Sequence, residues 1–213
     1  MLNYIKNVFY VVVLIGFSCS HAGSYDDFFQ AIKRDDVRTI QNLLSRGFDP
    51  NTLAPDLQPG LIYAIRSDSA KVALVMAQNT ASKVEVRNAN DESALMFAAL
   101  KGMAEVCELL ISRDADVNKP GWTALHYAAT GGHVPVIRLL LEHNAYIDAA
   151  SPNGTTPLMM AALYGFDSSV YELIESGADP MLKNAAGLNA VDFALKGRSP
   201  DSLTLILNAV GRR

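Results

Sequence analysis

A short apolar pattern recurs six times along the chain at nearly constant spacing, and this repeat limits the possible folds more than any other sequence feature. Aligned on a large apolar residue with alanine three positions later, the segments are FFQAIKRDD, LIYAIRSDS, LMFAALKGM, LHYAATGGH, LMMAALYGF and VDFALKGRS. These anchor residues stand at positions 28, 61, 95, 125, 158 and 191, so the spacings are 33, 34, 30, 33 and 33 residues. Such a period predicts a stack of repeated units.

Most anchors are followed by a second apolar helical segment: IQNLL, VCELLI, VIRLLL, VYELI and LTLIL. Two helices of about ten residues cannot bury their apolar faces alone, so each unit must stack on the next. Paired alanines such as Ala98 and Ala99 let neighbouring helices approach closely. Each first helix is expected to end on a glycine in the left-handed conformation, at Gly102, Gly132 and Gly165.

The repeat resembles the ankyrin repeat family, whose unit is a β-turn followed by two antiparallel helices. GWTALHYAATGGH and GTTPLMMAALYGF are close copies of the family's G-x-T-P-L-H-x-A-A-x-x-G-H pattern, and the resemblance covers Tyr25 to Leu207. It implies an all-α solenoid over residues 23–213, with about six helix-turn-helix units and β-turn or hairpin tips. The expected units are 25–52, 53–87, 88–118, 119–150, 151–183 and 184–210.

Three histidines, a tyrosine and two threonines lie within residues 121–145 and raise the question of a reaction centre. Catalysis would need a nucleophile, an oriented base and an oxyanion donor at one point. The resemblance implies instead that His126 hydrogen-bonds its own turn and a neighbouring unit, and that His133 belongs to a Gly-His turn. Thr123 and Thr156 are placed to cap first helices. We therefore expect structural roles for all four residues.

The first 22 residues differ in character from the repeats. An apolar run of about ten residues, VFYVVVLIGF, is too short to span a bilayer and suits a secretory signal. Ser20, His21 and Ala22 supply a small-x-small pattern, so we predict cleavage after Ala22 and a periplasmic or secreted protein. A lipoprotein acylated at Cys19 and an uncleaved anchor are the alternatives.

Composition excludes several classes of function. The formal net charge is -4, and no basic run is longer than a pair such as Arg212-Arg213, which argues against nucleic acid or an anionic membrane as the main partner. Cys107, the only cysteine left after cleavage, cannot form an intramolecular disulfide and is expected to be a buried small hydrophobe. No CxxC, HExxH or phosphate-binding loop occurs, so we expect no metal and no cofactor, and we expect a monomer.

The resemblance places partner binding on the concave side, at the turn tips and the exposed positions of the first helices. Transferred residue by residue, the expected partner-binding set is Glu92, Leu100, Lys101, Trp122, Thr130, Thr155, Leu163, Tyr164 and Leu188. Gln58, Arg66 and Lys196 hold equivalent positions in other units. An aromatic anchor with a polar rim is typical of binding hot spots.

Two irregularities interrupt the repeat. The spacing of 30 residues between the third and fourth anchors predicts a turn shortened by three residues, which would leave a notch with Trp122 at its edge. The second unit contains TLAPDLQPG and lacks a closing Gly-Ala-Asp, so we expect it to be the most irregular and mobile unit.

The preferred hypothesis is an exported, non-enzymatic scaffold that binds one partner protein through its concave face. By resemblance, its role could be that of a toxin antagonist or immunity protein, or of a helper for a periplasmic peroxide-defence enzyme. An effector acting on a eukaryotic host is a further alternative, although such effectors usually lack a general secretory signal. An enzyme using His126 or Cys107 is disfavoured because the repeats leave no room for a separate catalytic domain.

Overall fold

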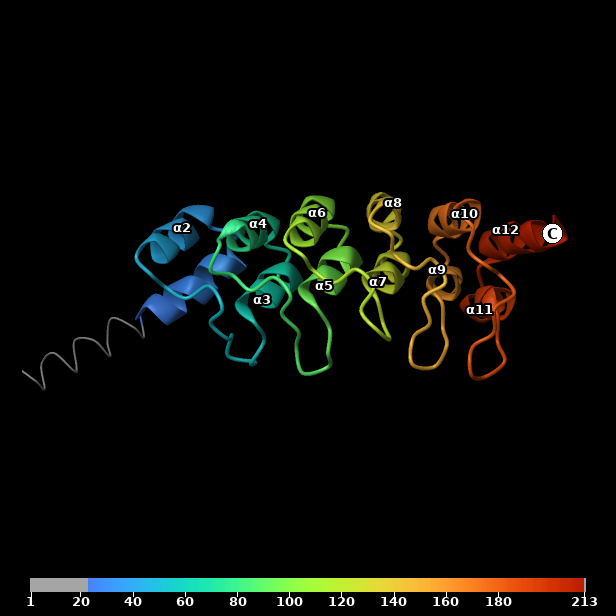
Figure 1. The fold of residues 1–213 in the computed structure, drawn as a ribbon, viewed down its shortest axis with the longest axis horizontal. Helices are drawn as coiled ribbons and strands as arrows, with labels where there is room; N and C mark the ends of the chain where they lie inside the picture. Colours follow the sequence, from blue (N-terminus) through green and yellow to red (C-terminus); the bar gives the residue numbers. More distant parts are fainter. Residues whose placement is uncertain (1–22, 213) are drawn as a thin grey trace, which may run out of the picture.

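The computed structural model describes residues 23–212, which form an elongated stack of helix pairs (Figure 1). No strand occurs over these residues, and isolated antiparallel bridges such as Arg87 to Ser93 mark hairpin-like tips. The predicted all-α ankyrin solenoid is therefore confirmed. The predicted signal peptide, its cleavage site after Ala22 and the alternative lipidation site at Cys19 lie outside the described residues.

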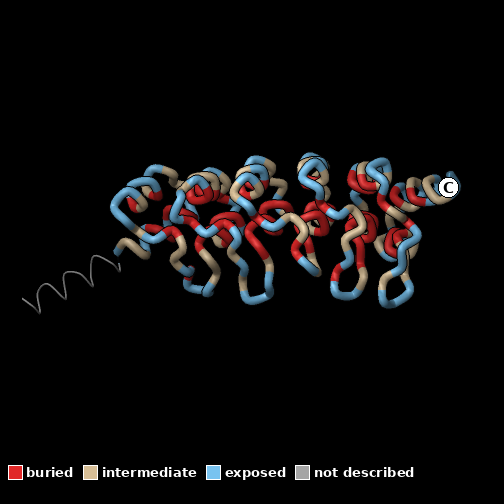
Figure 2. The backbone as a smooth tube through the Cα atoms, viewed as in Figure 1, coloured by how far each residue is buried: buried red, intermediate tan, exposed pale blue. Residues whose placement is uncertain are grey.

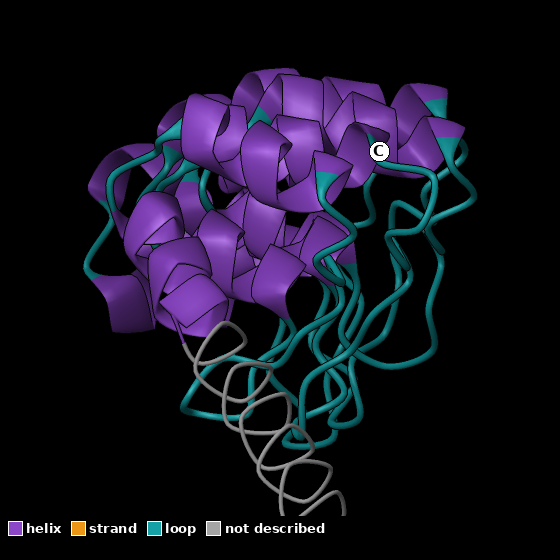
Figure 3. Ribbon diagram, turned by 90° about the vertical axis from the view of Figure 1, so that its left-hand side faces the viewer, coloured by secondary structure: helices purple, strands orange, loops and turns teal. Residues whose placement is uncertain are grey.

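Each unit contributes one helix to each of two layers. The first layer contains a helix over residues 23–33 and then α3 (Gly60–Arg66), α5 (Ala94–Leu100), α7 (Ala124–Gly131), α9 (Pro157–Tyr164) and α11 (Ala190–Gly197). The second layer contains α2 (Val37–Ser45), α4 (Ala70–Gln78), α6 (Ala104–Ser112), α8 (Val134–Glu142), α10 (Asp167–Glu175) and α12 (Pro200–Gly211). Neighbouring helices of each layer are in contact. The loops that precede the first helices project together to one side (Figure 3).

The hydrophobic core runs along the stack between the two layers (Figure 2). The paired alanines Ala98 and Ala99 are fully buried, as close helix contact requires. Gly102, Gly132 and Gly165 have φ angles of 69°, 74° and 71°, in the left-handed region expected at the end of a first helix. A β-carbon on Gly132 would also clash with the ring of Phe166 in the next unit, so this glycine serves the stacking as well as the turn.

Several first helices begin with a capping box, in which the capping residue and the third helical residue bond each other's backbone N–H. Thr123 Oγ1 accepts a hydrogen bond from the backbone N–H of His126 (3.4 Å), and His126 Nδ1 accepts one from the N–H of Thr123 (3.2 Å). A methionine sulfur replaces the imidazole in two other units: Met96 Sδ accepts from Ser93 N, and Met159 Sδ accepts from Thr156 N. The cap at the start of the helix therefore does not require histidine.

His126 adds a contact that methionine cannot make. Its Nε2 donates to the carbonyl oxygen of Thr155 in the next unit (2.8 Å), so one buried ring joins two units. Because both ring nitrogens are engaged, the neutral tautomer with hydrogen on Nε2 satisfies them all. Burial lowers the pKa of His126 to about 4 and outweighs the opposing hydrogen bond to Thr155.

Further cross-links join the layers. His133 Nε2 donates to the carbonyl of Leu100 (2.9 Å), which ties the start of α8 to the end of α5 in the preceding unit. In the irregular second unit, α4 stops at Gln78, and Asn79 is extended. Arg113, from the following unit, donates to the carbonyls of Ala77, Asn79 and Ser82 and so caps this end from outside. The expected irregularity is therefore present, whereas the mobility of the unit stays a prediction.

The C-terminal unit exposes a surface that the other units bury. Leu195 occupies the position held by Ala99, Ala129 and Ala162, which are fully buried, yet 58% of Leu195 is exposed. Among the described residues no further unit covers this surface.

We predict that His126→Met lowers the free energy of unfolding by about 1 kcal/mol at pH 7.5, because the hydrogen bond to Thr155 is lost while the cap is kept. The substitution should also change the pH dependence. A histidine with a folded-state pKa of about 4 and an ordinary value of 6.5 gives stability that is complete above pH 6.5 and decreases as pH falls toward 4. Denaturant unfolding from pH 7.5 to 4.5 should show a loss of roughly 2 to 3 kcal/mol in the native protein. Equal losses in His126→Met would contradict the assignment.

We also predict that Arg113→Lys destabilises the second unit by about 1 to 2 kcal/mol, because an ammonium cannot reach three carbonyls as the planar guanidinium does. Hydrogen exchange at residues 77–82 should accelerate. Arg138→Lys is the matched control, since Arg138 pairs with Glu172 on the exposed side of α8. The interpretation is wrong if the two variants exchange equally in this segment.

Candidate binding groove

The first helices and the loops that precede them form one surface of the stack, which we call the inner surface (Figure 3). Several side chains on this surface pack against the core and also stay partly exposed, so their identity carries information about binding as well as stacking. One row of them stands two positions after each anchor except the first: Tyr63, Phe97, Tyr127, Met160 and Phe193. All five are at least half-buried, and the rings of Phe97 and Tyr127 meet edge to face with centroids 6.3 Å apart. A large apolar row therefore forms the floor of the inner surface.

A groove lies over the middle of this row. Leu100, Trp122, Tyr127, Thr130 and Met160 line it, with a volume of about 240 Å³. Leu100, Trp122 and Thr130 belong to the predicted partner-binding set, and the structure brings them together across α5, α7 and the loop before α7. Tyr127 and Met160 were missed, although the repeated aromatic or methionine residue two positions after the anchor could have indicated them.

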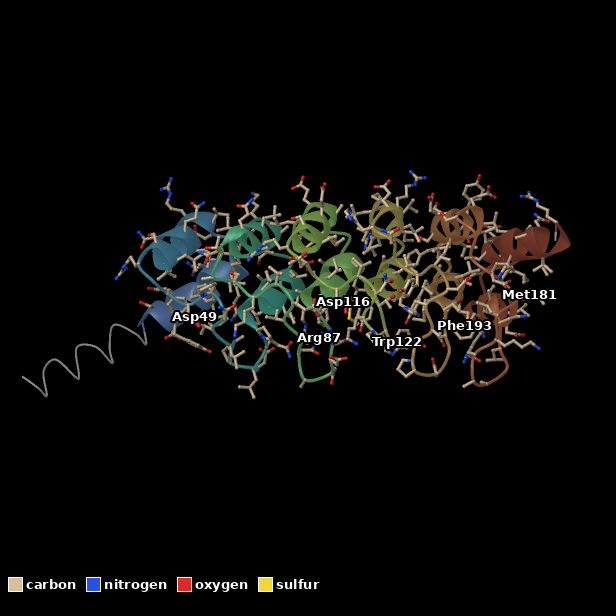
Figure 4. All side chains as sticks on the ribbon, viewed as in Figure 1. Asp49, Arg87, Asp116, Trp122, Met181 and Phe193 are labelled. Atoms are coloured by element: carbon tan, nitrogen blue, oxygen red, sulfur yellow. The ribbon has the colours of Figure 1, made fainter. Side chains whose placement is uncertain are left out.

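The shortened turn shapes one wall of the groove. The loop before α7 is shorter than its neighbours, as predicted (Figure 1), and Trp122 lies on the loop side of α7 (Figure 4). The indole packs edge to face on the His126 ring, with centroids 5.1 Å apart. Lys119 turns inward and is only 6% exposed, and its Nζ lies 2.6 Å from the Asp91 carboxylate of the neighbouring loop. The hydrogen bond from Lys119, followed by that from Arg87, lowers the pKa of Asp91.

The polar groups beside the groove already satisfy one another. Tyr127 Oη donates to Glu92 Oε1 (2.6 Å), and Asn88 Nδ2 donates to Glu92 Oε2 (2.7 Å). Burial raises the pKa of Glu92, but hydrogen bonds from Asn88 and Tyr127 and the charge of Arg66 outweigh burial and leave the pKa lowered. Burial raises the pKa of Tyr127, and the hydrogen bond to the charged Glu92 raises it further. Glu92 is thus ionised at neutral pH, and its hydrogen-bonding capacity is largely used inside the protein.

The other predicted partner-binding residues do not line the groove. Lys101 pairs with Asp68 (2.9 Å), Leu163 and Leu188 are partly buried, and Tyr164 is 54% exposed. Their role in binding stays a prediction.

Thr155 requires a correction. We expected an exposed side chain at a turn tip, but Thr155 is 2% exposed. Its carbonyl accepts from His126, and its N–H donates to Ser151 Oγ (2.9 Å). The loop is held against α7 at this point, so Thr155 belongs to the junction between units and its side chain is not available to a partner.

Other chemical signals are confined to the interior. Cys107 is fully buried, and burial raises the pKa of its thiol to about 12, so the thiol is protonated at neutral pH.

Across residues 23–212, no group of three or more His, Cys, Asp or Glu side chains could hold a metal ion. Nor does the described part of the chain contain a helix that is long and apolar enough to cross a membrane.

Curated proteins similar to this chain share its repeats. The nuclear factor NF-kappa-B p105 subunit of Gallus gallus is 31% identical over 178 residues, which are 80% of this chain and 18% of that protein. Ankyrin repeat and SAM domain-containing protein 6 of Rattus norvegicus is 39% identical over 143 residues, 65% of this chain and 16% of that protein. The B-cell lymphoma 3 protein homolog of Mus musculus is 32% identical over 152 residues, 68% of this chain and 34% of that protein.

The chain therefore spans only about a third or less of these relatives. A family model for ankyrin repeats in three copies matches residues 28–120 and 114–184. These matches cover most of the described stack, and its helix pairs, caps and turns have the geometry that the motif requires. The chain belongs to the ankyrin repeat family.

Proposed function

We propose that this protein is an exported, non-enzymatic scaffold that binds one partner protein through the groove on its inner surface. Ankyrin repeats form scaffolds for interactions between proteins. The observation that carries the proposal for this chain is an apolar groove with an aromatic wall, set among polar residues on the inner surface. Central aromatic residues in a partly desolvated site are typical anchors of protein interfaces.

The size of the groove supports a protein partner. Pockets for drug-sized ligands have volumes of about 300 to 1,000 Å³. A cavity of about 150 Å³ holds benzene, so the groove, at about 240 Å³, suits one large side chain of a partner.

The buried state of the two candidate catalytic groups supports a non-enzymatic role. His126 is fully buried, and both of its ring nitrogens already have partners within the protein. Cys107 is fully buried with a protonated thiol. Neither group is in position to act on a substrate from solution.

The groove is tested by comparing two threonines with the same local bonding. Thr130 Oγ1 donates to the His126 carbonyl (2.8 Å) on α7, and Thr204 Oγ1 donates to the Pro200 carbonyl (2.9 Å) on exposed α12. Lys196 holds the position of Thr130 in the last unit, where it is exposed, so the fold of each lysine variant is checked before binding is compared.

We predict that Thr130→Lys weakens partner binding at least about tenfold, because it places an ammonium in an apolar site, whereas Thr204→Lys has no effect. The partner would be captured from periplasmic extract with the native protein, purified, and titrated against both variants after circular dichroism confirms their folds. Equal affinities would show that the partner binds elsewhere.

Export is tested separately. The short apolar segment and the Ser-His-Ala sequence support cleavage after Ala22. We predict that the full chain, expressed in a bacterium, is recovered from the periplasmic fraction with Gly23 as its first residue by N-terminal sequencing. An acylated Cys19 would support the lipoprotein alternative, and an intact N-terminus in the membrane fraction would support an uncleaved anchor.

A further inference from the structure

Arg66 ends α3, in the second unit, and is connected to the groove through two aromatic rings. Its guanidinium carbon is 5.5 Å from the centre of the Phe97 ring. Phe97 contacts Tyr127 edge to face, and Tyr127 lines the groove. Arg66 therefore continues the row of residues that extends from the groove toward the N-terminal units.

Arg66 has no ion-pair partner among the described residues, although its charge acts on Glu92. Other cations near the groove are paired, Lys101 with Asp68 and Lys119 with Asp91. Over residues 23–212, Arg66 forms no ion pair within 4.0 Å. Glu92 responds to the charge of Arg66, but its two oxygens accept from Tyr127 and Asn88. Stacking on Phe97 leaves the in-plane N–H donors of the guanidinium available for a carboxylate from outside.

The same helix position shows how charge is distributed along the inner surface. From the first unit to the last it holds Lys33, Arg66, Leu100, Thr130, Leu163 and Lys196. The cations are in the first two units and in the last, the middle is uncharged, and Lys196, like Arg66, has no carboxylate within 4.0 Å among the described residues. A basic segment laid along this row would meet like charge at both ends, whereas an acidic one would meet complementary charge.

We infer that the groove binds an acidic polypeptide segment of the partner, with one large apolar side chain in the groove and a neighbouring carboxylate paired with Arg66. The inference rests on the proposed function and specifies the chemistry of the partner. The apolar side chain supplies buried area, and the guanidinium, already oriented by Phe97, forms a charge-assisted pair at the rim.

The test is a selection from a random library of 12-residue peptides displayed on phage, with residues 23–213 as target. Enriched peptides would be synthesised, and their affinities measured by fluorescence polarisation for the native protein and for Arg66→Glu. Lys71→Glu is the matched control, because Lys71 is an exposed cation on α4, the other helix of the same unit, and gives the same change in charge. Arg66→Leu removes the charge but keeps an apolar contact with Phe97, so it separates charge from packing.

We expect the enriched peptides to share a large apolar residue with aspartate or glutamate close by. Their affinity should fall roughly five- to tenfold in Arg66→Glu, fall less in Arg66→Leu, and stay unchanged in Lys71→Glu, and it should weaken with added salt.

Thr130→Lys blocks the groove, so it distinguishes binding in the groove from the preference for an acidic segment. Peptides that lose affinity in Thr130→Lys but lack acidic residues, or that bind Arg66→Glu as well as the native protein, would overturn this inference and leave the groove as the binding site. Peptides that are indifferent to Thr130→Lys would contradict the proposed function too. A selection that enriches no peptide also overturns the inference.

Discussion

Stacking between neighbouring units is the constraint on which this structure depends, because no helix pair in the chain can bury its apolar face alone. Paired alanines and glycines bring the helices close, and a series of hydrogen bonds fixes their register. At each of four junctions, a side-chain oxygen of one unit accepts from a backbone N–H in the closing turn of the next: Asn51 from Lys83, Glu85 from Asp116, Asn118 from Tyr146, and Asp148 from Asp179. These ties and the core together hold the stack.

The fold could be predicted from the sequence because the residues that determine it recur in every unit. Anchors, caps and left-handed glycines recur at fixed positions, and one unit therefore predicts the next. The contacts that escaped prediction arise between units. Arg113 reaches carbonyls more than thirty residues earlier without any repeated signal. Thr155 was expected at an exposed tip, because the sequence does not show that its carbonyl accepts a hydrogen bond from His126 in the preceding unit. Tyr127 and Met160 belong to different units, and stacking brings them together at the groove.

The fourth unit contains both a junction that stabilises the stack and a wall of the candidate groove. His126 caps its own helix and joins the next unit, and its ring also supports Trp122, which forms a wall of the groove. The shortened turn places Trp122 there, while Lys119 turns inward to Asp91 and ties the short loop to its neighbour. A substitution that loosens this junction would therefore also change the shape of the groove, so stability must be measured beside affinity in any variant of this unit.

The central claim is that a partner occupies the groove beside Trp122, and the protein carries its own reporter of that event, because Trp122 is the only tryptophan in the sequence. The most direct measurement is the fluorescence emission of Trp122 during titration with a purified partner, or with a selected peptide, that contains no tryptophan. The account predicts that the emission shifts to shorter wavelength along the binding isotherm, because the indole loses contact with water. Emission that stays constant while an independent method shows saturated binding would contradict the account.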